Sequence, residues 1–390
     1  MCIRDSYRAV LGCYKPRLRY WEFWTFFNVN IKKLFYKYLS YVQGIVDTRP
    51  TMLILSHVLL EAKGGKLFLS STDLESSVYT SFPANIIEEG SVCLPAKKIY
   101  EIVEKTPEGE IQIQTINDLQ AQIDYKKGKT KIKTQNAEDF PQIPKPDDFV
   151  YRAIKSEKLD SLIKKTLYCI GSDDLRKNLT GIFFDMTQNG KIRLVSTDGH
   201  RMSLAEENIE NSIVESFTLP KRASIELRKF IKDSEVINIG VGKNFFICDD
   251  GQTSLLARLV DVKFPDYKQV LPTSFKNTIK IEKKQLTDAL QRASVVLQEK
   301  NKGVKIYIGE NKMEIRSTSD DGETIEEVAV DKLTEPLDVG FNVKYLIDAL
   351  STYEEQEVCL SIGDEVSPAC IFSSEDDRYR QLSVVMPMRV

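Results

Sequence analysis

KLFLSSTDLE (residues 66–75) is the stretch that decides the fold, because the chain repeats it twice. It returns as KIRLVSTDGH (residues 191–200) and, in a more diverged form, as KMEIRSTSDD (residues 312–321). The equivalent threonines of the three copies are Thr72, Thr197 and Thr318, which are 125 and 121 residues apart. A repeat of this period is close to the size of a domain.

A second landmark keeps the same period. Leu94-Pro95 opens LPAKKIYEIVEK, Leu219-Pro220 opens LPKRASIELRKFIKD, and Phe341-Asn342 opens FNVKYLIDALSTY, at spacings of 125 and 122 residues. Two landmarks that share one period predict three copies of one fold. We expect domains at residues 27–147, 148–272 and 273–390, joined by stiff proline-rich linkers, after an extension at residues 1–26.

Composition excludes several classes of protein. The 390 residues are 42% hydrophobic and 28% charged, and no run approaches the roughly 20 apolar residues of a membrane span. Seven scattered cysteines without a CxxC pair, together with only two histidines, argue against a disulfide framework and a zinc site. We expect a cytoplasmic protein that does not insert into membranes and holds no metal or cofactor.

The first 26 residues differ from the rest. They contain both tryptophans and the stretch YKPRLRYWEFW, but no uninterrupted apolar region of a secretion signal. The sequence leaves two interpretations: a tail that binds a membrane surface or a partner, and an unstructured or non-native extension. We favour the second.

The order of the expected elements predicts an α+β fold. Each copy begins with a strand and an amphipathic helix, continues with alternating strands, and then repeats that unit after the second landmark. In the third copy, Leu286, Ala289, Leu290 and Ala293 have the three-and-four spacing of one buried helical face. The six expected helices are residues 30–43, 97–105, 157–170, 221–233, 282–300 and 343–353.

Charge is sorted between the elements although the net charge is only −3. The six expected helices carry roughly +9, which leaves about −12 for everything else. One interpretation is that the helices share a basic surface that faces a polyanion, and the other is that they are ordinary lysine-covered helices in solvent. The charge pattern alone favours neither.

The two ends of the chain also differ in charge. Strand DYKKGKTKIKTQ of the first copy is rich in lysine, whereas TSDDGETIEE at the corresponding edge of the third copy is rich in carboxylates. Opposite charges at the two ends favour head-to-tail pairing, and two chains that pair in this way can close a ring.

Several strings resemble one family closely. RPTMLIL, VSTDGHRMSLA, FPDYKQVLP, GFNVKYLIDAL and the terminal VVMPMRV are similar to the β subunit of bacterial DNA polymerase III, the sliding clamp that acts as its processivity factor. The resemblance runs from about residue 29 to the C-terminus, with motifs of all three copies in order. It implies the DNA clamp fold, with helices that line the interior of a ring and sheets on its outside.

The resemblance also implies a function without catalysis. Such a clamp is a ring of two chains that encircles double-stranded DNA without sequence specificity and tethers proteins to it. The implied partners are the α subunit of the replicative polymerase, the clamp loader and other proteins with a clamp-binding motif.

The resemblance implies a peptide cleft between the second and third domains. Methionine and valine would give it an adaptable apolar surface, while His200, Arg201 and Asn342 would fix polar groups of the peptide. The implied peptide-binding residues are Leu179, Thr197, Gly199, His200, Arg201, Met202, Pro265, Val270, Asn342, Tyr345, Val366, Val384, Val385, Met386, Pro387 and Met388. From the residues alone, MPMR is equally well read as a final core strand.

Two further sets follow from the resemblance and the charge pattern. The DNA-binding candidates are Arg49, Lys97, Lys98, Arg176, Lys221 and Arg222. The dimer-interface candidates are Lys127, Lys129, Lys131, Val295, Val296, Glu323, Glu326 and Glu327. Asp173 stands where relatives can have a neutral amide, which puts the contact of its loop with DNA in doubt. Lys268-Gln269 replaces paired arginines beside the cleft.

Two other classes of function remain open. His200 beside Asp198 could form the catalytic dyad of a hydrolase, although no serine or cysteine nucleophile motif accompanies it. A monomeric three-domain scaffold could bind peptides without encircling anything. The native mass separates the scaffold from the ring.

Overall fold

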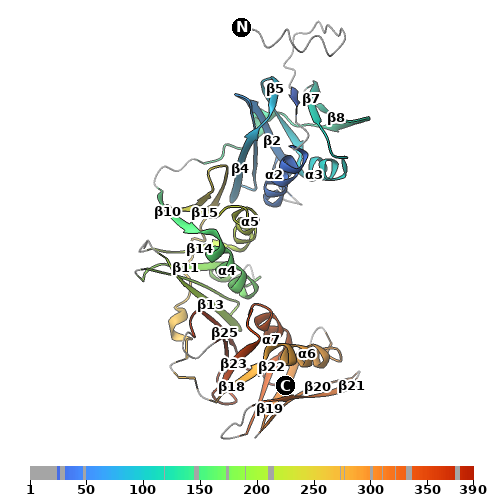
Figure 1. The fold of residues 1–390 in the computed structure, drawn as a ribbon. Coiled ribbons are helices and arrows are strands. Elements are labelled where there is room, and N and C mark those ends of the chain that lie inside the picture. Colours follow the sequence, from blue (N-terminus) through green and yellow to red (C-terminus); the bar gives the residue numbers. More distant parts are fainter. Residues whose placement is uncertain are drawn as a thin grey trace. The chain divides into compact units, whose positions relative to one another are not determined.

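The computed structural model describes residues 24–26, 31–46, 50–117, 119–144, 149–172, 175–188, 190–209, 215–272, 274–275, 277–298, 302–309, 311–320, 322–330, 336–373 and 378–390 (Figure 1). The chain divides into two compact units. The first lies within residues 1–71 and 80–141, and the second lies within residues 72–79 and 142–390.

In the described part of the first unit, the α-helices α2 (Ile31–Ile45) and α3 (Ala96–Lys105) pack against each other. One sheet has the strand order β5-β1-β7-β8-β9, and in the other β4, β3, β2 and β6 lie side by side. The strands are β1 (Trp24–Phe26), β2 (His57–Lys63), β3 (Lys66–Thr72), β4 (Ser76–Pro83), β5 (Asn85–Glu88), β6 (Gly90–Pro95), β7 (Ile111–Asn117), β8 (Gln120–Tyr125) and β9 (Gly128–Lys133), and the 3-10 helices are η1 (Leu53–Ser56) and η2 (Ala137–Asp139). The boundary between the two units falls within β4, because residues 72–79 belong to the second unit.

The second unit contains two helix pairs, α4 (Ser156–Thr166) with α5 (Lys221–Ile231) and α6 (Lys283–Ser294) with α7 (Val343–Leu350). Its 3-10 helices are η3 (Leu167–Cys169), η4 (Lys177–Leu179) and η5 (Tyr267–Gln269). Its strands are β10 (Val150–Lys155), β11 (Gly181–Asp185), β12 (Lys191–Thr197), β13 (Arg201–Asn208), β14 (Ser216–Pro220), β15 (Val236–Val241), β16 (Phe245–Asp249), β17 (Thr253–Arg258), β18 (Thr278–Glu282), β19 (Gly303–Ile308), β20 (Lys312–Ser319), β21 (Gly322–Ala329), β22 (Leu337–Asn342), β23 (Glu357–Ile362), β24 (Ala369–Phe372) and β25 (Gln381–Val385).

The doubled strand-helix-strands unit predicted from the sequence is confirmed by this order of elements. β10, α4 and β11 to β13 are followed by β14, α5 and β15 to β17, and the pattern repeats from β18 to β25. The two halves exchange their first strands, because β10 pairs with β15 and β14 pairs with β11. The α+β class is therefore as expected.

Helix α6 shows why the helices form where the periodicity places them. Leu286, Ala289, Leu290 and Ala293 are all buried and belong to one cluster with the strands beneath them. Burying a leucine side chain stabilises the fold by about 1.5–3 kcal/mol, so this single face accounts for the position of the helix. Figure 1 shows α6 beside α7.

The repeated STD motif builds the same turn twice. Asp73 Oδ1 accepts the amides of Glu75 and Ser76 at 3.0 and 2.6 Å, and Asp198 Oδ1 accepts those of His200 and Arg201 at 2.9 and 3.0 Å. The residue after each aspartate has a positive φ, 75° at Leu74 and 90° at Gly199. The internal repeat thus extends to individual hydrogen bonds.

Several helices end earlier than predicted: those expected to reach residues 353 and 233 end at Leu350 and Ile231, and two others differ more. The helix expected over residues 282–300 ends at Ser294, and the one expected to reach residue 170 ends at Thr166 and continues as η3. After Ser294 the amides of Val295 and Leu297 bond to carbonyls three residues back, as in a tightened final turn. Because Val295 is exposed, no burial pulls it back into the helix.

No helix in the described part of the chain combines the length and the apolar character that a bilayer crossing requires.

Candidate peptide-binding cleft and other functional surfaces

The predicted cleft residues gather in one sheet of the second unit, where a strand from the second copy of the repeat pairs with a strand from the third copy. Strand β13 pairs with β25, the last strand of the chain, in the register Arg201↔Val385 and Met202↔Val384. On its other side β25 pairs with β24. Residues of the second and third copies of the repeat are therefore joined by a continuous backbone ladder.

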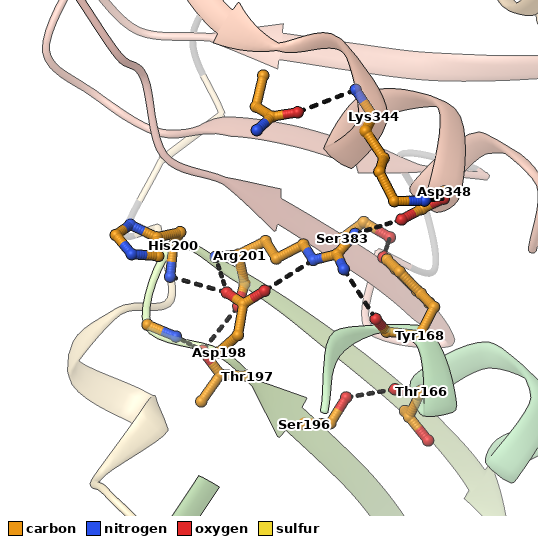
Figure 2. Close-up of polar contacts among 12 residues, drawn as sticks. Thr166, Tyr168, Ser196, Thr197, Asp198, His200, Arg201, Lys344, Asp348 and Ser383 are labelled. Atoms are coloured by element: carbon orange, nitrogen blue, oxygen red, sulfur yellow. Dashed lines mark hydrogen bonds and ion pairs between the residues drawn. The ribbon is translucent and has the colours of Figure 1, made fainter. Parts of the chain in front are cut away.

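Arg201 lies at the centre of this junction (Figure 2). Its Nε donates to Asp198 Oδ2 at 2.9 Å, Nη1 to Asp348 Oδ2 at 2.8 Å, and Nη2 to the Tyr168 carbonyl at 3.0 Å. The guanidinium also lies over the Tyr345 ring, 4.3 Å from its centroid. With a side chain only 10% exposed, Arg201 ties helix α7 to strand β13.

The surroundings of Arg201 keep its charge. Burial alone would lower its pKa, but the hydrogen bonds to Asp348 and Asp198 raise the pKa of Arg201 above its usual value. Since its three nitrogens already donate to the protein, Arg201 acts here as a structural cation. Whether it also contacts a peptide stays a prediction.

The turn at residues 197–201 is built by side chains that fold back onto it. Thr197 Oγ1 donates to the Arg201 carbonyl at 2.7 Å and accepts the Gly199 amide at 3.1 Å. A side chain at Gly199 would be strained at its φ of 90° and would begin 2.7 Å from Arg176 Nη1. The arginine expected to contact DNA therefore lies against the turn that carries His200.

Asp198 does not orient a catalytic imidazole. Its carboxylate accepts two backbone amides and the Arg201 Nε, as Figure 2 shows, and the bond from His200 comes from the backbone and not from the ring. A general base in a triad needs the carboxylate to hold its ring N–H. The geometry of the turn therefore counts against the hydrolase interpretation.

Four predicted cleft residues are buried. Val384 and Val385 are each 1% exposed, and Met202 and Val384 share one hydrophobic cluster with Tyr267. Leu179 is buried too, and its carbonyl accepts the amide of Gly171. These buried side chains belong to the core beneath the predicted site, and whether they contact a peptide stays a prediction.

The exposed apolar residues come from three segments. Met386 and Met388 follow the end of β25 and are 40% and 38% exposed. Val270 lies just after η5, and Val366 lies in the connection from β23 to β24. The interpretation of MPMR as a final core strand is wrong, because β25 ends at Val385 and Met386 and Met388 expose their side chains to solvent.

Asn342, Pro265 and Pro387 complete the predicted set. Asn342 caps α7, because its Oδ1 accepts the Lys344 amide at 3.0 Å. Pro265 is exposed at the start of the linker, and Pro387 is half-buried between the two exposed methionines. The cap leaves the amide nitrogen of Asn342 for other bonds.

A polar network that the sequence did not reveal fixes the linker at the cleft. Tyr267 donates its hydroxyl to Asp185 Oδ2 at 2.6 Å and accepts from Arg193 Nη1 at 3.1 Å. Burial and the bond to Asp185 raise the pKa of Tyr267 to about 12, so the hydroxyl remains a donor at neutral pH. Lys268 Nζ lies 3.9 Å from Asp185, and Gln269 donates to Asp266 at 3.0 Å.

No metal site is found among the residues described. No group of three or more His, Cys, Asp or Glu side chains there is arranged to hold an ion.

The DNA-binding candidates lie at helix starts and turns. Lys97 and Lys98 are exposed in the first turn of α3, and Lys221 is exposed at the start of α5. Arg222 pairs with Asp73 at 2.8 Å. Arg49 and Asp173 lie outside the described residues.

The dimer candidates lie on two edge strands. Lys129 and Lys131 are exposed on β9, after Lys127 in the preceding turn, and β9 and β21 each end a sheet among the described strands. On β21, Glu326 bonds to Arg292 at 2.9 and 2.6 Å and Glu327 to Lys312 at 3.1 Å, whereas Glu323 forms no ion pair with a described residue. Val295 is 80% exposed, Val296 is half-buried against Gly322, and Ile325, which sequence reasoning missed, is also exposed.

Family models match almost the whole chain. The N-terminal, central and C-terminal domains of the DNA polymerase III beta subunit match residues 25–144, 153–266 and 268–389. The beta sliding clamp of Pseudomonas putida KT2440 is 30% identical over 364 residues, which cover 91% of this chain and 97% of the relative. That of Vibrio cholerae is 28% identical with the same coverage.

Solved structures agree. The DNA polymerase III beta subunit of Thermotoga maritima has a TM-score of 0.88 at 27% identity and covers 94% of this chain and 100% of its own. The sliding clamp of Pseudomonas aeruginosa bound to griselimycin has a TM-score of 0.86 at 27% identity with the same coverage. On this fold and these matches, the chain belongs to the DNA polymerase III beta subunit family, the bacterial beta sliding clamps.

Proposed function

We propose that this protein is a DNA sliding clamp, a homodimeric ring that encircles duplex DNA and tethers the replicative polymerase to confer processivity. The observation that carries the proposal is the ordered match of all three domains of one family over residues 25–389. The clamp is not an enzyme, because its task is to raise the effective concentration of its partners at the DNA. We place it in the cytoplasm, where bacterial chromosomes are copied.

The edge strands support a head-to-tail ring of three domains per chain, at the boundaries expected from the repeat. β9 of one copy would extend the sheet of β21 in the other, with Lys129 and Lys131 facing Glu323. Val295 and Ile325 would form the apolar centre of this contact. Because the contact joins unlike ends of the chain, two copies can close it twice.

The proposed ring would hold DNA without recognising its base sequence. Lys97, Lys98 and Lys221 offer exposed ammonium groups near helix starts, which suits phosphate contacts that carry no sequence information. Arg49, Arg176 and Arg222 are the further candidates. A closed ring needs no tight contact, since escape requires opening it.

The cleft would bind short hydrophobic peptides of the polymerase α subunit, the clamp loader and other clamp-binding proteins. Met386, Met388, Val270 and Val366 supply its exposed apolar surface, and the backbone around His200 and Asn342 supplies polar groups. Relatives from Pseudomonas aeruginosa and Bartonella birtlesii are bound to griselimycin. We infer that griselimycin is a usable probe of the same cleft in this chain.

Primer extension tests the proposal. With the polymerase and loader of the same organism on a long primed template, adding this chain is expected to lengthen the products made in a single binding event. Unchanged product length with an active polymerase would contradict the proposal. A native mass equal to one chain at micromolar concentration would favour the monomeric scaffold instead.

A further inference from the structure

The last five residues of the chain are held at two points on different elements. After β25 ends at Val385, the Met386 amide donates to the His200 carbonyl at 2.9 Å. Two residues later, the Met388 amide donates to the Gly340 carbonyl at 2.8 Å. The tail therefore runs from the turn before β13 to strand β22, across the junction of the cleft.

The C-terminal tail packs directly against the α-carbon of Gly340. A Cβ added there would lie 2.3 Å from the Met388 carbonyl oxygen and 2.7 Å from Val390 Cγ2. The first of these neighbours is backbone, which cannot rotate away as a side chain does. Since Gly340 does not have a positive φ, the close approach of the tail, and not the conformation of the residue, is what requires glycine.

The edge position of β22 explains how the tail reaches Gly340. β22 pairs with β19 through the register Lys305↔Gly340 and is the last strand in the order β21-β20-β19-β22. Its outer side is therefore open to the tail, and Met388 uses one of the carbonyls there. Two residues after Gly340, Asn342 caps α7, which also carries Tyr345.

We propose that Gly340 is a positioning residue of the peptide cleft, because it seats the tail that carries Met386 and Met388 without touching a ligand itself. This inference rests on the proposed function, because it takes the cleft to bind partner peptides. Any side chain at Gly340 lifts the tail from β22, breaks the Met388 hydrogen bond and moves both exposed methionines. The sequence gives no hint of this role, since the close contact depends on a segment about 50 residues further along the chain.

The test compares Gly340→Ala with Gly309→Ala, each in the full chain and in a chain that lacks residues 388–390. Gly309 belongs to the same domain, and a Cβ there meets only the side chain of Tyr307, at 3.2 Å. Two quantities are measured: hydrogen exchange of the Met388 amide in the full chain without ligand, and griselimycin affinity by calorimetry in both chains. A thermal scan checks that each variant is folded.

We expect Gly340→Ala to remove the protection of the Met388 amide and to lower griselimycin affinity about tenfold in the full chain, while Gly309→Ala changes neither. In the truncated chain, Gly340→Ala should cause no further loss of affinity, because the tail it displaces is already gone. Undiminished Met388 protection, or an equal loss of affinity in the truncated chain, would overturn the proposal.

Met388→Pro provides a second route to the same answer if Gly340→Ala does not fold. Met388→Pro and Met388→Ala both remove the Met388 side chain, but only proline also removes the donated N–H, so Met388→Pro is expected to lower griselimycin affinity further than Met388→Ala does. Equal affinity in these two variants would contradict the role of the tail seat. If the unmodified chain does not bind griselimycin at all, the cleft assignment fails, while the exchange of the Met388 amide still decides whether Gly340 seats the tail.

Discussion

Arg201 of strand β13 and Asp348 of helix α7 form an ion pair, with 2.8 Å between Nη1 and Oδ2, although 147 residues separate them in the chain. Asp348 also accepts from Lys344 at 3.3 Å, while Arg201 bonds to Asp198 in the turn before its own strand. The pair fixes the helix that carries Tyr345 against the turn that carries His200. The junction of β13 and α7 therefore depends on a contact that is largely hidden from solvent.

Arg201→Ala is expected to lower the free energy of unfolding by about 3 kcal/mol, since it leaves two partly buried carboxylates without their partner. Urea denaturation measures this. Lys284→Ala is the matched control, because it removes an exposed ion pair with Asp288 and should leave the midpoint unchanged. A loss in Arg201→Ala no larger than in the control would show that the junction does not depend on this pair.

His57 is expected to make stability fall in mild acid. It is buried, with Nδ1 3.0 Å from the Leu53 carbonyl, and burial lowers its pKa below the usual 6.5. His57 therefore binds a proton more readily in the unfolded chain than in the folded chain, so the free energy of unfolding falls as the pH falls below about 6.5. Denaturant titrations from pH 7.5 to 5 measure this.

His200 provides the control for that experiment, because it is the only other histidine and is exposed. His57→Gln should reduce the slope of stability against pH, whereas His200→Gln should keep it. Identical slopes in the two variants would mean that His57 does not contribute to the acid sensitivity.

Val295→Glu is expected to convert the dimer into monomers, because it places a charge at the centre of the proposed interface. Sedimentation velocity at micromolar concentration measures the change. Val236→Glu, at the first residue of β15 and 49% exposed, is the matched control and should keep the native mass. A dimer that survives Val295→Glu would place the interface elsewhere.

Deleting residues 386–390 is expected to weaken griselimycin binding at least tenfold while leaving the dimer intact, since these residues carry the exposed methionines of the cleft. Calorimetry and native mass on the same sample separate the two effects. Full affinity after the deletion would show that the C-terminal tail is not part of the binding site.

The helices and strands could be predicted because their signals are local. The buried stripe of Leu286, Ala289, Leu290 and Ala293 and the alternation in EIQIQTI both follow from the periodicity of one segment. The end of α6 could not be predicted in this way. It depends on whether Val295 finds apolar neighbours, and the fold leaves it exposed.

The candidate cleft residues were identified from the family resemblance, and the structure adds the contacts that hold them in place. Asp348, Tyr168 and Asp185 carry no motif, and they matter because the fold brings them to Arg201 and Tyr267. Charge patterning predicted Glu326 and Glu327 as interface carboxylates, which stays a prediction, and it did not reveal that Arg292 and Lys312 of the same chain bind them. Pairing between distant residues is fixed by packing and is not visible in a single sequence.

Retention on circular DNA tests the central claim most directly. The chain is loaded onto nicked circles by its clamp loader, free protein is removed, and half of the sample is linearised. The account predicts that the protein stays on the circles and leaves the linear DNA within the time it needs to slide off the ends. Equally fast release from both forms would contradict a ring that holds DNA by encircling it.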